Sequence, residues 1–338
     1  MKPLTPKRLA WICGTLGGAL LLVMAISLKF GATPVSLTEL LVNLWRVAVG
    51  TIAEIPSEHQ MFVFELRLPR ILLGVLVGAA LSVAGAGFQA LLRNPLADPY
   101  VLGVSSGAAL GAILSLILAA NRPLAMPLAA FAGAAVTIAA VYFLGRRSGE
   151  IDSYTLLLGG IITASFLSGV IMFLMTTLSG RDLRGIAFWL MGDLSSPAPV
   201  AAGWLFAVLG LAIGAIYTTA ADLNLLLSGE QEAMHLGVDV PRVKLVVYLG
   251  ASVLTGLAVS VSGAIGYVGL LVPHVMRMLF GSDYRVLIPT SALGGAIVIV
   301  AADTLARTIV SPTQLPVGAM TAIAGAPTFL YLLRRRLP

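Results

Sequence analysis

Residues 71–92 read ILLGVLVGAALSVAGAGFQALL and contain no charged side chain. A helix needs about 20 mainly apolar residues to cross the ~30 Å hydrocarbon layer of a membrane, and this run is long enough. Its many glycine and alanine residues allow neighbouring helices to approach closely, which is how helices associate in lipid. The stretch therefore predicts a transmembrane helix inside a tightly packed bundle.

The rest of the chain has the same character. Apolar residues make up 58% of the 338 residues, charged residues only 11%, and the mean hydropathy is +0.98. Soluble domains are nearer half apolar and a quarter charged, so this composition excludes a soluble enzyme and a disordered chain. Together with nine further apolar spans, residues 71–92 predict an all-α polytopic membrane protein with about ten transmembrane helices. The nine spans are Leu9–Leu28, Val101–Ala120, Pro127–Leu144, Thr155–Leu178, Val200–Ala220, Leu245–Val261, Ile265–Phe280, Val286–Ala306 and Pro316–Leu333.

Two of these spans need comment. Leu9–Leu28 is longer than the apolar region of a typical signal peptide and has no small-residue cleavage site before Lys29, so we interpret it as a retained first helix. Leu245–Phe280 is too long for one crossing and short for two, and Ser260–Gly266 is the natural break.

An internal repeat relates two parts of the chain. Residues 78–86 (GAALSVAGA) and 256–264 (GLAVSVSGA) are identical at six of nine positions, and Pro95 and Pro273 follow at the same spacing. Five predicted crossings separate the copies, so the two copies have opposite orientations in the membrane. Inverted repeats are typical of transporters. We expect a single transmembrane domain over 1–338 with pseudo-repeats of roughly 1–195 and 196–338; the alternative is a chance likeness between small-residue helices.

The distribution of lysine and arginine predicts that both termini are cytoplasmic, which also explains the net charge of +6 without nucleic acid as a partner. Arg67, Arg70 and Arg307 fall on the outside and oppose this tendency. Asp303 and Arg307 are one helical turn apart and are placed to pair. Such arginines either snorkel to lipid phosphates or pair with nearby acidic residues, or they bind carboxylates of a soluble partner.

Two short helices are expected outside the membrane. Arg181–Leu194 has apolar residues at helical spacing and is predicted to lie along the outer membrane surface. In the longest cytoplasmic loop, Ser228 and Gln231 form a predicted capping box, and Gly237 fits the left-handed position that ends a helix. Pro241 then opens the next element.

The chain lacks the residues that most chemistry would need. The spans carry almost no ionisable groups at their centres, so an ion-coupled carrier would lack its usual residues. There is no Gly-rich loop with Lys and Ser or Thr to hold phosphates. Its one cysteine and three scattered histidines predict no metal site. Catalysis by this chain is therefore not expected, and energy is expected from a separate ATPase. The rivals are an ATP-independent carrier or channel and, less well supported, a membrane-embedded enzyme.

Several long motifs together resemble one known family. They include Arg67-Leu-Pro-Arg70, Arg93-Asn-Pro-Leu-Ala-Asp-Pro99, Gly263-Ala-Ile-Gly-Tyr-Val-Gly-Leu-Leu-Val-Pro-His274 and Leu315-Pro-Val-Gly318. The chain resembles the FecCD-type permeases of type II ABC importers, which take up iron–siderophore complexes, haem and vitamin B12. The resemblance implies a homodimer in the bacterial inner membrane with the pathway on its axis. It also implies two cytoplasmic ATPase subunits that hold ATP and Mg, a periplasmic or lipid-anchored binding protein, and no cofactor in this chain.

The resemblance also implies roles for particular residues. Arg67, Arg70 and Arg307 match external arginines that meet glutamates of the binding protein. A cytoplasmic gate would include Asn94 and Leu96, with Ser153 and Tyr154 at a second position where the family often has small hydroxyl residues, so the tyrosine departs from the pattern. The coupling helix that docks on the ATPase would be Ser228–Gly237, including Gln231, Met234, His235 and Leu236. The expected cargo is a ferric siderophore or haem, with cobalamin as the alternative.

Overall fold

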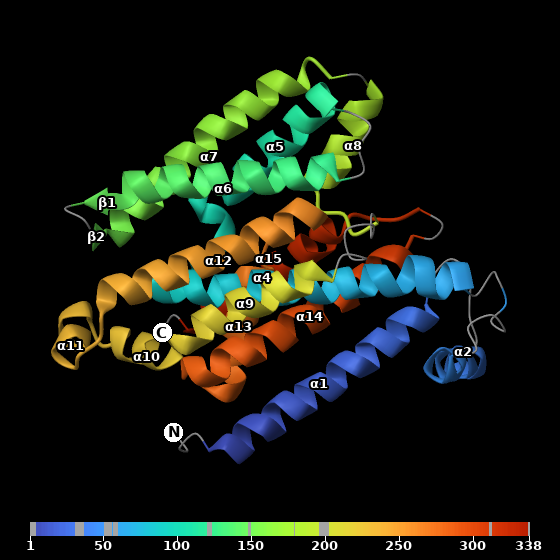
Figure 1. The fold of residues 1–338 in the computed structure, drawn as a ribbon, viewed down its shortest axis with the longest axis horizontal. Coiled ribbons are helices and arrows are strands. Elements are labelled where there is room, and N and C mark those ends of the chain that lie inside the picture. The colour runs from blue at the N-terminus through green and yellow to red at the C-terminus, as the bar shows by residue number, and fades with distance from the viewer. Residues whose placement is uncertain are drawn as a thin grey trace.

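A computed structural model describes residues 5–30, 37–50, 56, 60–119, 124–147, 150–178, 180–195, 203–310 and 313–336. The described chain is almost entirely helical (Figure 1). The long helices run roughly side by side along the longest dimension of the molecule. This arrangement confirms the predicted all-α fold.

Helix α4 (Leu68–Leu91) lies at the centre and coincides with the run 71–92 that predicts it. Nearly every residue from Arg70 to Leu91 is buried. The helix follows directly from a π-helical segment, η2 (Gln60–Arg67), and packs against α12 (Val240–Ser262), α13 (Val268–Phe280) and α14 (Tyr284–Thr308). An all-apolar helix is stable in this position because neighbouring helices surround it on every side.

Glycines set how closely these helices approach α4. A Cβ atom added at Gly78 would overlap the backbone carbonyl of Gly295 in α14, and one added at Gly85 would overlap that of Gly269 in α13. The helix backbones are therefore in direct contact, as small residues allow in membrane bundles. The repeated small-residue pattern is the sequence signal of this packing.

Within the described residues, ten apolar segments correspond to the ten predicted spans when α9 and α10 are taken together. Six are long and apolar enough to cross a membrane, and the pair α9 and α10, bent by 48° at residue 219, is a seventh candidate. Three shorter apolar helices are α5, α13 and α15. The remaining bounds are α1 (Pro6–Lys29), α5 (Val104–Ala119), α6 (Ala125–Gly145), α7 (Ser153–Met175), α9 (Trp204–Thr218), α10 (Ala220–Leu226) and α15 (Val317–Arg336).

The predicted break near 260–266 is confirmed. Helix α12 ends at Ser262, Gly263 takes a positive φ of 66°, and α13 begins at Val268. Tyr267 also adopts a left-handed conformation with φ 69°, which is uncommon for a bulky residue. Its side chain packs against Gly325 of α15, where a Cβ would come within 2.7 Å of it. The turn therefore redirects the chain against the last helix.

The inverted repeat is visible in the directions of α4 and α12. The end of α4 (Ala90 and Leu91) and the start of α12 (Val243 and Val247) line one small cavity, so the two helices run antiparallel. Figure 1 shows the same opposition: α4 runs toward the side of α10 and α11, and α12 runs away from it. The two copies of the repeat thus have opposite orientations, as predicted.

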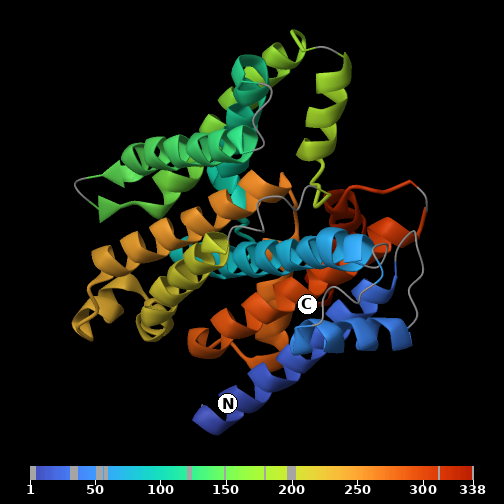
Figure 2. The same cartoon turned by 45° about the vertical axis from the view of Figure 1, so that its right-hand side comes forward.

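The other helices form layers around this centre. Helices α5, α6 and α7 lie together on one side, and α1 lies along α14 on the other (Figure 1). Figure 2 shows α8 (Gly180–Leu190), the predicted surface helix, leading from α7 back toward the central layer. The Asp193 N–H donates to the Ser262 carbonyl at 2.8 Å and joins this connection to the end of α12.

Short elements complete the described chain. Helix α2 (Leu37–Val49) lies between α1 and η2 in the chain, and α11 (Glu230–His235) belongs to the predicted cytoplasmic loop. A 3-10 turn, η3 (Pro99–Leu102), precedes α5. Strands β1 (Arg146–Arg147) and β2 (Glu150–Ile151) form a two-stranded antiparallel pair between α6 and α7.

The packing at Gly78 yields a test. We expect Gly78→Ala to lower the free energy of unfolding by about 1–3 kcal/mol, because the added methyl group overlaps the Gly295 carbonyl. The matched control is Gly18→Ala in α1, where an added Cβ meets nothing within 4 Å. In a helix this control change is neutral or stabilising by up to ~1 kcal/mol. Equilibrium unfolding in detergent measures both; equal effects of the two variants would contradict the close packing.

Candidate functional site: gate loop, coupling helix and arginine cluster

The first part of the site is the connection between α4 and η3, residues 92–98, which we call the gate loop. The loop is held by its own hydrogen bonds: the Asn94 N–H donates to the Gln89 carbonyl at 3.2 Å, and the Ala97 N–H to the Asn94 carbonyl at 3.0 Å. The Asn94 side-chain oxygen accepts from the Leu96 N–H at 2.9 Å. The side chain of Leu96 is exposed. Asn94 therefore shapes a compact turn that presents Leu96 at its tip.

The far end of the gate loop is closed by Asp98 and Tyr100. Asp98 accepts a hydrogen bond from the Tyr100 N–H at 2.9 Å and so caps η3. Burial raises the pKa of Asp98 to about 6, although this hydrogen bond opposes the rise. The Tyr100 hydroxyl donates to the Ile265 carbonyl at 3.2 Å and accepts from the Ile265 N–H at 2.9 Å. These bonds attach the end of the loop to the break between α12 and α13.

The second predicted gate position meets the first. The Ser153 hydroxyl, at the start of α7, donates to the carbonyl of Leu91 at the end of α4 at 3.0 Å. Asp152 caps α7 by accepting from the Thr155 N–H at 2.8 Å. The side chain of the neighbouring Tyr154 is 74% exposed. The structure thus places Ser153, but not Tyr154, in contact with the end of α4 where the gate loop begins.

Gln89, a buried glutamine that the sequence analysis did not identify, fixes the end of α4 just before the gate loop. Gln89 donates to the carbonyls of Gly269 and Leu270 in α13, each at 3.3 Å, and its oxygen accepts from Arg277 at 3.1 Å. A glutamine inside an otherwise apolar run was the available signal, because a buried polar side chain requires partners.

The predicted coupling helix, α11, differs from the sequence prediction in how its N-terminus is capped. Gly229, with φ 136°, stands at the N-cap position, and no side chain caps the helix. The predicted capping box of Ser228 and Gln231 is therefore wrong; Gly229 lets the chain turn sharply into the helix instead. At the other end Gly237 has φ 87°, and the N–H groups of Gly237 and Val238 donate to the carbonyls of Met234 and Ala233. This Schellman arrangement confirms the predicted stop.

The coupling helix presents an apolar surface. Ala233 is buried and anchors the helix, whereas Met234 and Leu236 are 52% and 65% exposed. His235 between them is exposed as well. Adjacent exposed apolar side chains on a short polar connection are typical of an interaction site. Pro241 lies in the first turn of α12, as predicted.

One acidic residue joins the coupling helix to the gate loop. Glu230 places one carboxylate oxygen 2.8 Å from the Arg93 guanidinium and the other 2.7 Å from the Lys244 ammonium. Arg93 belongs to the gate loop, and Lys244 to α12. We did not predict this contact, because the three residues are far apart in sequence and meet only in the fold.

The predicted external arginines gather at the opposite end of the bundle. Arg70 donates to Asp303 from Nε at 2.9 Å, and its Nη2 lies 2.8 Å from the same carboxylate. The Arg307 Nε lies 3.0 Å from the other oxygen of Asp303, which confirms the expected pair. All three side chains are more than nine-tenths buried. Asp303 is thus the shared anion of two arginines.

The third arginine points elsewhere. Arg67 donates to the carbonyl of Leu28, near the end of α1, at 2.9 Å. A cation is favourable there because the end of a helix carries unsatisfied carbonyl groups. Arg307 also donates to the Ser27 hydroxyl at 2.7 Å. The three arginines and Asp303 together carry two positive charges in excess, and this group, called the arginine cluster, ties α1 to α4 and α14.

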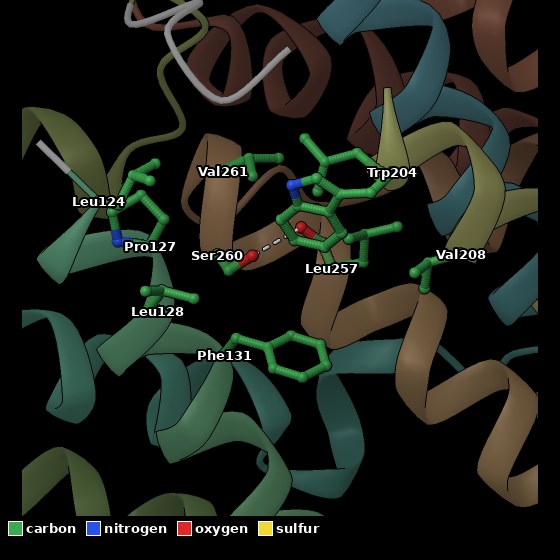
Figure 3. A pocket seen from close by; sticks show the side chains of 10 residues that line it. Leu124, Pro127, Leu128, Phe131, Trp204, Val208, Leu257, Ser260 and Val261 are labelled. Carbon is green, nitrogen blue, oxygen red and sulfur yellow. Dashed lines mark hydrogen bonds between the residues drawn. The ribbon is translucent and has the colours of Figure 1, made fainter. Parts of the chain in front are cut away.

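An apolar cavity of about 320 Å³ lies between α6, α9 and α12 (Figure 3). Of the residues that line it, only Ser260 carries a hydroxyl, and this group donates to the Leu257 carbonyl at 2.9 Å. The cavity therefore offers little to fix a polar ligand in one orientation. Its walls are Leu124, Pro127, Leu128, Phe131, Trp204, Leu205, Val208, Leu257, Ser260 and Val261.

Comparisons with known proteins agree with one another. The model of the FecCD transport family matches residues 19–335. The cobalamin import system permease protein BtuC of Halobacterium salinarum is 46% identical over 83% of this chain and 76% of its own length. The hemin transport system permease protein HmuU of Yersinia pestis is 42% identical over 80% of this chain and 83% of its own. A solved structure described as an inward-facing metal-chelate type ABC transporter superposes with a TM-score of 0.80 at 30% identity, covering 96% of this chain and 99% of that one.

The buried carboxylate of the arginine cluster yields a stability test. We expect Asp303→Asn to lower the free energy of unfolding by about 3–5 kcal/mol, because Arg70 and Arg307 would lose their shared counter-charge while buried. The control Asp222→Asn, in the short helix α10, should stay within about 0.5 kcal/mol of the parent. Equilibrium unfolding in detergent measures both. Equal losses would show that the cluster does not depend on the Asp303 charge.

Proposed function

Because the chain belongs to the FecCD transport family, we propose that it is the membrane-spanning permease subunit of an ABC importer for a metal chelate. The observation that carries this proposal is the exposed apolar surface of α11, which lies at the same end of the bundle as the gate loop and is joined to it through Glu230. A partner bound to α11 is thus placed to move the gate.

The proposed cargo is a metal ion inside a large organic ligand. The named relatives carry cobalamin and haemin, and a further relative, the Fe(3+) dicitrate permease protein FecD of Escherichia coli, is 36% identical. We favour a ferric siderophore or haem, with cobalamin as the alternative. Apolar walls such as those in Figure 3 suit such cargo, because few fixed polar groups are present to hold a chelate during its passage.

Energy would come from two separate ATPase subunits that hold ATP and Mg, since the sequence contains no phosphate-binding loop. Met234 and Leu236 would insert into a cleft of the ATPase. Nucleotide can favour one state of the permease only through contacts that differ between states. The contacts between the ATPase and the coupling helix would change with the nucleotide state. The resulting movement of the helix would then reach the gate residues Asn94, Leu96 and Ser153.

A second copy of the chain would complete the pathway. On α7 the side chains of Ile162, Phe166 and Phe173 are each more than 60% exposed, and Ile323 on α15 is 70% exposed. Such surfaces need either another helix or lipid against them. We propose a homodimer with its pathway at the shared axis, surrounded by membrane lipid.

The proposed location is the bacterial inner membrane with both termini in the cytoplasm. In Figure 1, α1 begins and α15 ends toward the side of α10 and α11, so both lie on the side proposed to face the ATPase. The arginine cluster then faces outward. Its two excess positive charges would attract carboxylates of a soluble binding protein, which delivers the cargo.

The coupling surface can be tested directly. In proteoliposomes holding the permease, its ATPase and its binding protein, we expect chelate uptake only with ATP. Met234→Ser with Leu236→Ser should lower uptake by at least about tenfold, because each buried apolar contact of this kind contributes above ~1 kcal/mol. The control replaces another exposed pair, Met278 and Leu279 of α13, by serine. Uptake by the permease alone without ATP would overturn the proposed function.

The proposed docking of the binding protein on the arginine cluster can be tested by measuring its affinity. We expect Arg67→Gln to weaken binding of the binding protein roughly twofold to fivefold. The Arg67 side chain is only 6% exposed, so the effect comes from removing one of the two excess positive charges of the arginine cluster and not from loss of a direct contact. Arg307→Glu is a less clean probe, because it would place a carboxylate beside Asp303. The control is Arg184→Gln on α8, whose side chain is exposed. Biolayer interferometry on nanodiscs gives both affinities, and an unchanged affinity for the Arg67 variant would remove this docking assignment.

A further inference from the structure

Glu230 lies where the gate loop, α12 and the coupling helix meet. Its carboxylate contacts Arg93 of the gate loop at 2.8 Å and Lys244 of α12 at 2.7 Å, and its own backbone begins the coupling helix. The Lys244 side chain is only 10% exposed, whereas those of Arg93 and Glu230 are 42% and 34% exposed. The contact with Lys244 is therefore the more sheltered of the two.

The gate loop is built to move as one piece. Its internal hydrogen bonds, described above, define a compact turn around Asn94. Arg93 enters that turn with φ 47°, a left-handed conformation that costs a residue with a Cβ atom about 1–2 kcal/mol and so needs support from its surroundings. The ion pair with Glu230 supplies such support at the residue where the loop leaves α4.

A purely local role for Glu230 does not explain this geometry. An acidic residue in the first turn of a helix is favourable for electrostatic reasons alone. The exposed Glu232, two residues later, would satisfy that preference equally well. Of these two glutamates, Glu230 is the one whose carboxylate contacts cations of two other segments.

We propose that Glu230 is a positioning residue that transmits displacement of the coupling helix to the gate loop through Arg93, while Lys244 keeps the carboxylate in place on α12. This inference rests on the proposed function of α11 as the docking element for an ATPase. When the helix shifts, the gate loop follows as a unit, because Arg93 is held to the helix and the rest of the turn is held to Arg93.

The test compares Glu230→Gln with Glu232→Gln in the reconstituted complex of permease, ATPase and binding protein. Both variants remove one carboxylate from the same helix. We expect Glu230→Gln to retain ATP hydrolysis while uptake per ATP falls roughly twofold to fivefold, the range that loss of a partly exposed ion pair predicts. Glu232→Gln should keep the wild-type ratio. Arg93→Gln should reproduce the Glu230 defect, and the double variant should be no worse than either single one.

Other outcomes overturn the inference in distinguishable ways. If Glu230→Gln keeps the wild-type uptake per ATP while the wild-type complex is ATP-dependent, the transmission role fails and the proposed function stands. If the variant instead loses assembly with the ATPase in size-exclusion chromatography, Glu230 is a docking residue and not a transmitter. Additive defects of Arg93→Gln and Glu230→Gln would show that the two act separately. A wild-type complex that needs no ATP would fail the proposed function itself.

Discussion

Backbone-to-backbone contact around α4 is the constraint on which the structure depends. Gly78 and Gly85 leave no room for a Cβ atom against Gly295 and Gly269, so the backbone of α4 is in direct contact with those of α14 and α13, while α12 packs against it through side chains. In a lipid environment, where apolar side chains gain nothing from leaving water, such contacts supply much of the force that holds helices together. The other helices pack around this rigid centre, and α4 links the two ends of the molecule.

Each end of α4 is connected to the rest of the bundle by charged groups, and the two connections differ in kind. At the start, the arginine cluster is deeply buried, so it fixes α1, α4 and α14 relative to one another. At the other end, the Glu230 contacts are partly exposed and join α11 to the gate loop and to α12. Buried, mutually hydrogen-bonded charges resist rearrangement, whereas partly exposed pairs form and break at small cost. The two ends of α4 therefore differ in how firmly their charged groups hold the neighbouring segments.

Several polar side chains near the gate loop and the apolar cavity are hydrogen-bonded to the backbone. Gln89, Ser153 and Tyr100 all donate to backbone carbonyls near the gate loop. Ser260, in the wall of the apolar cavity, donates to its own helix. The hydrogen-bonding capacity of these groups is therefore already used within the chain.

The sequence by itself determined the ten apolar helices, the break after Ser262, the helix stop at Gly237 and the inverted repeat, because apolar length, glycine position and internal similarity are local properties. Family motifs also led to the predictions that Asn94 and Leu96 belong to a gate and that Met234 belongs to a coupling helix. Only the tertiary structure showed that Gly229 and not Ser228 begins the coupling helix, that Asp303 serves both Arg70 and Arg307, and that Glu230 meets Arg93 and Lys244. The Arg70–Asp303 and Arg93–Glu230 pairs join residues more than a hundred positions apart, so the sequence carries no local signal of them, because they depend on which helix ends are neighbours in space. The Asp303–Arg307 pair, one helical turn apart, could be predicted because its spacing is local.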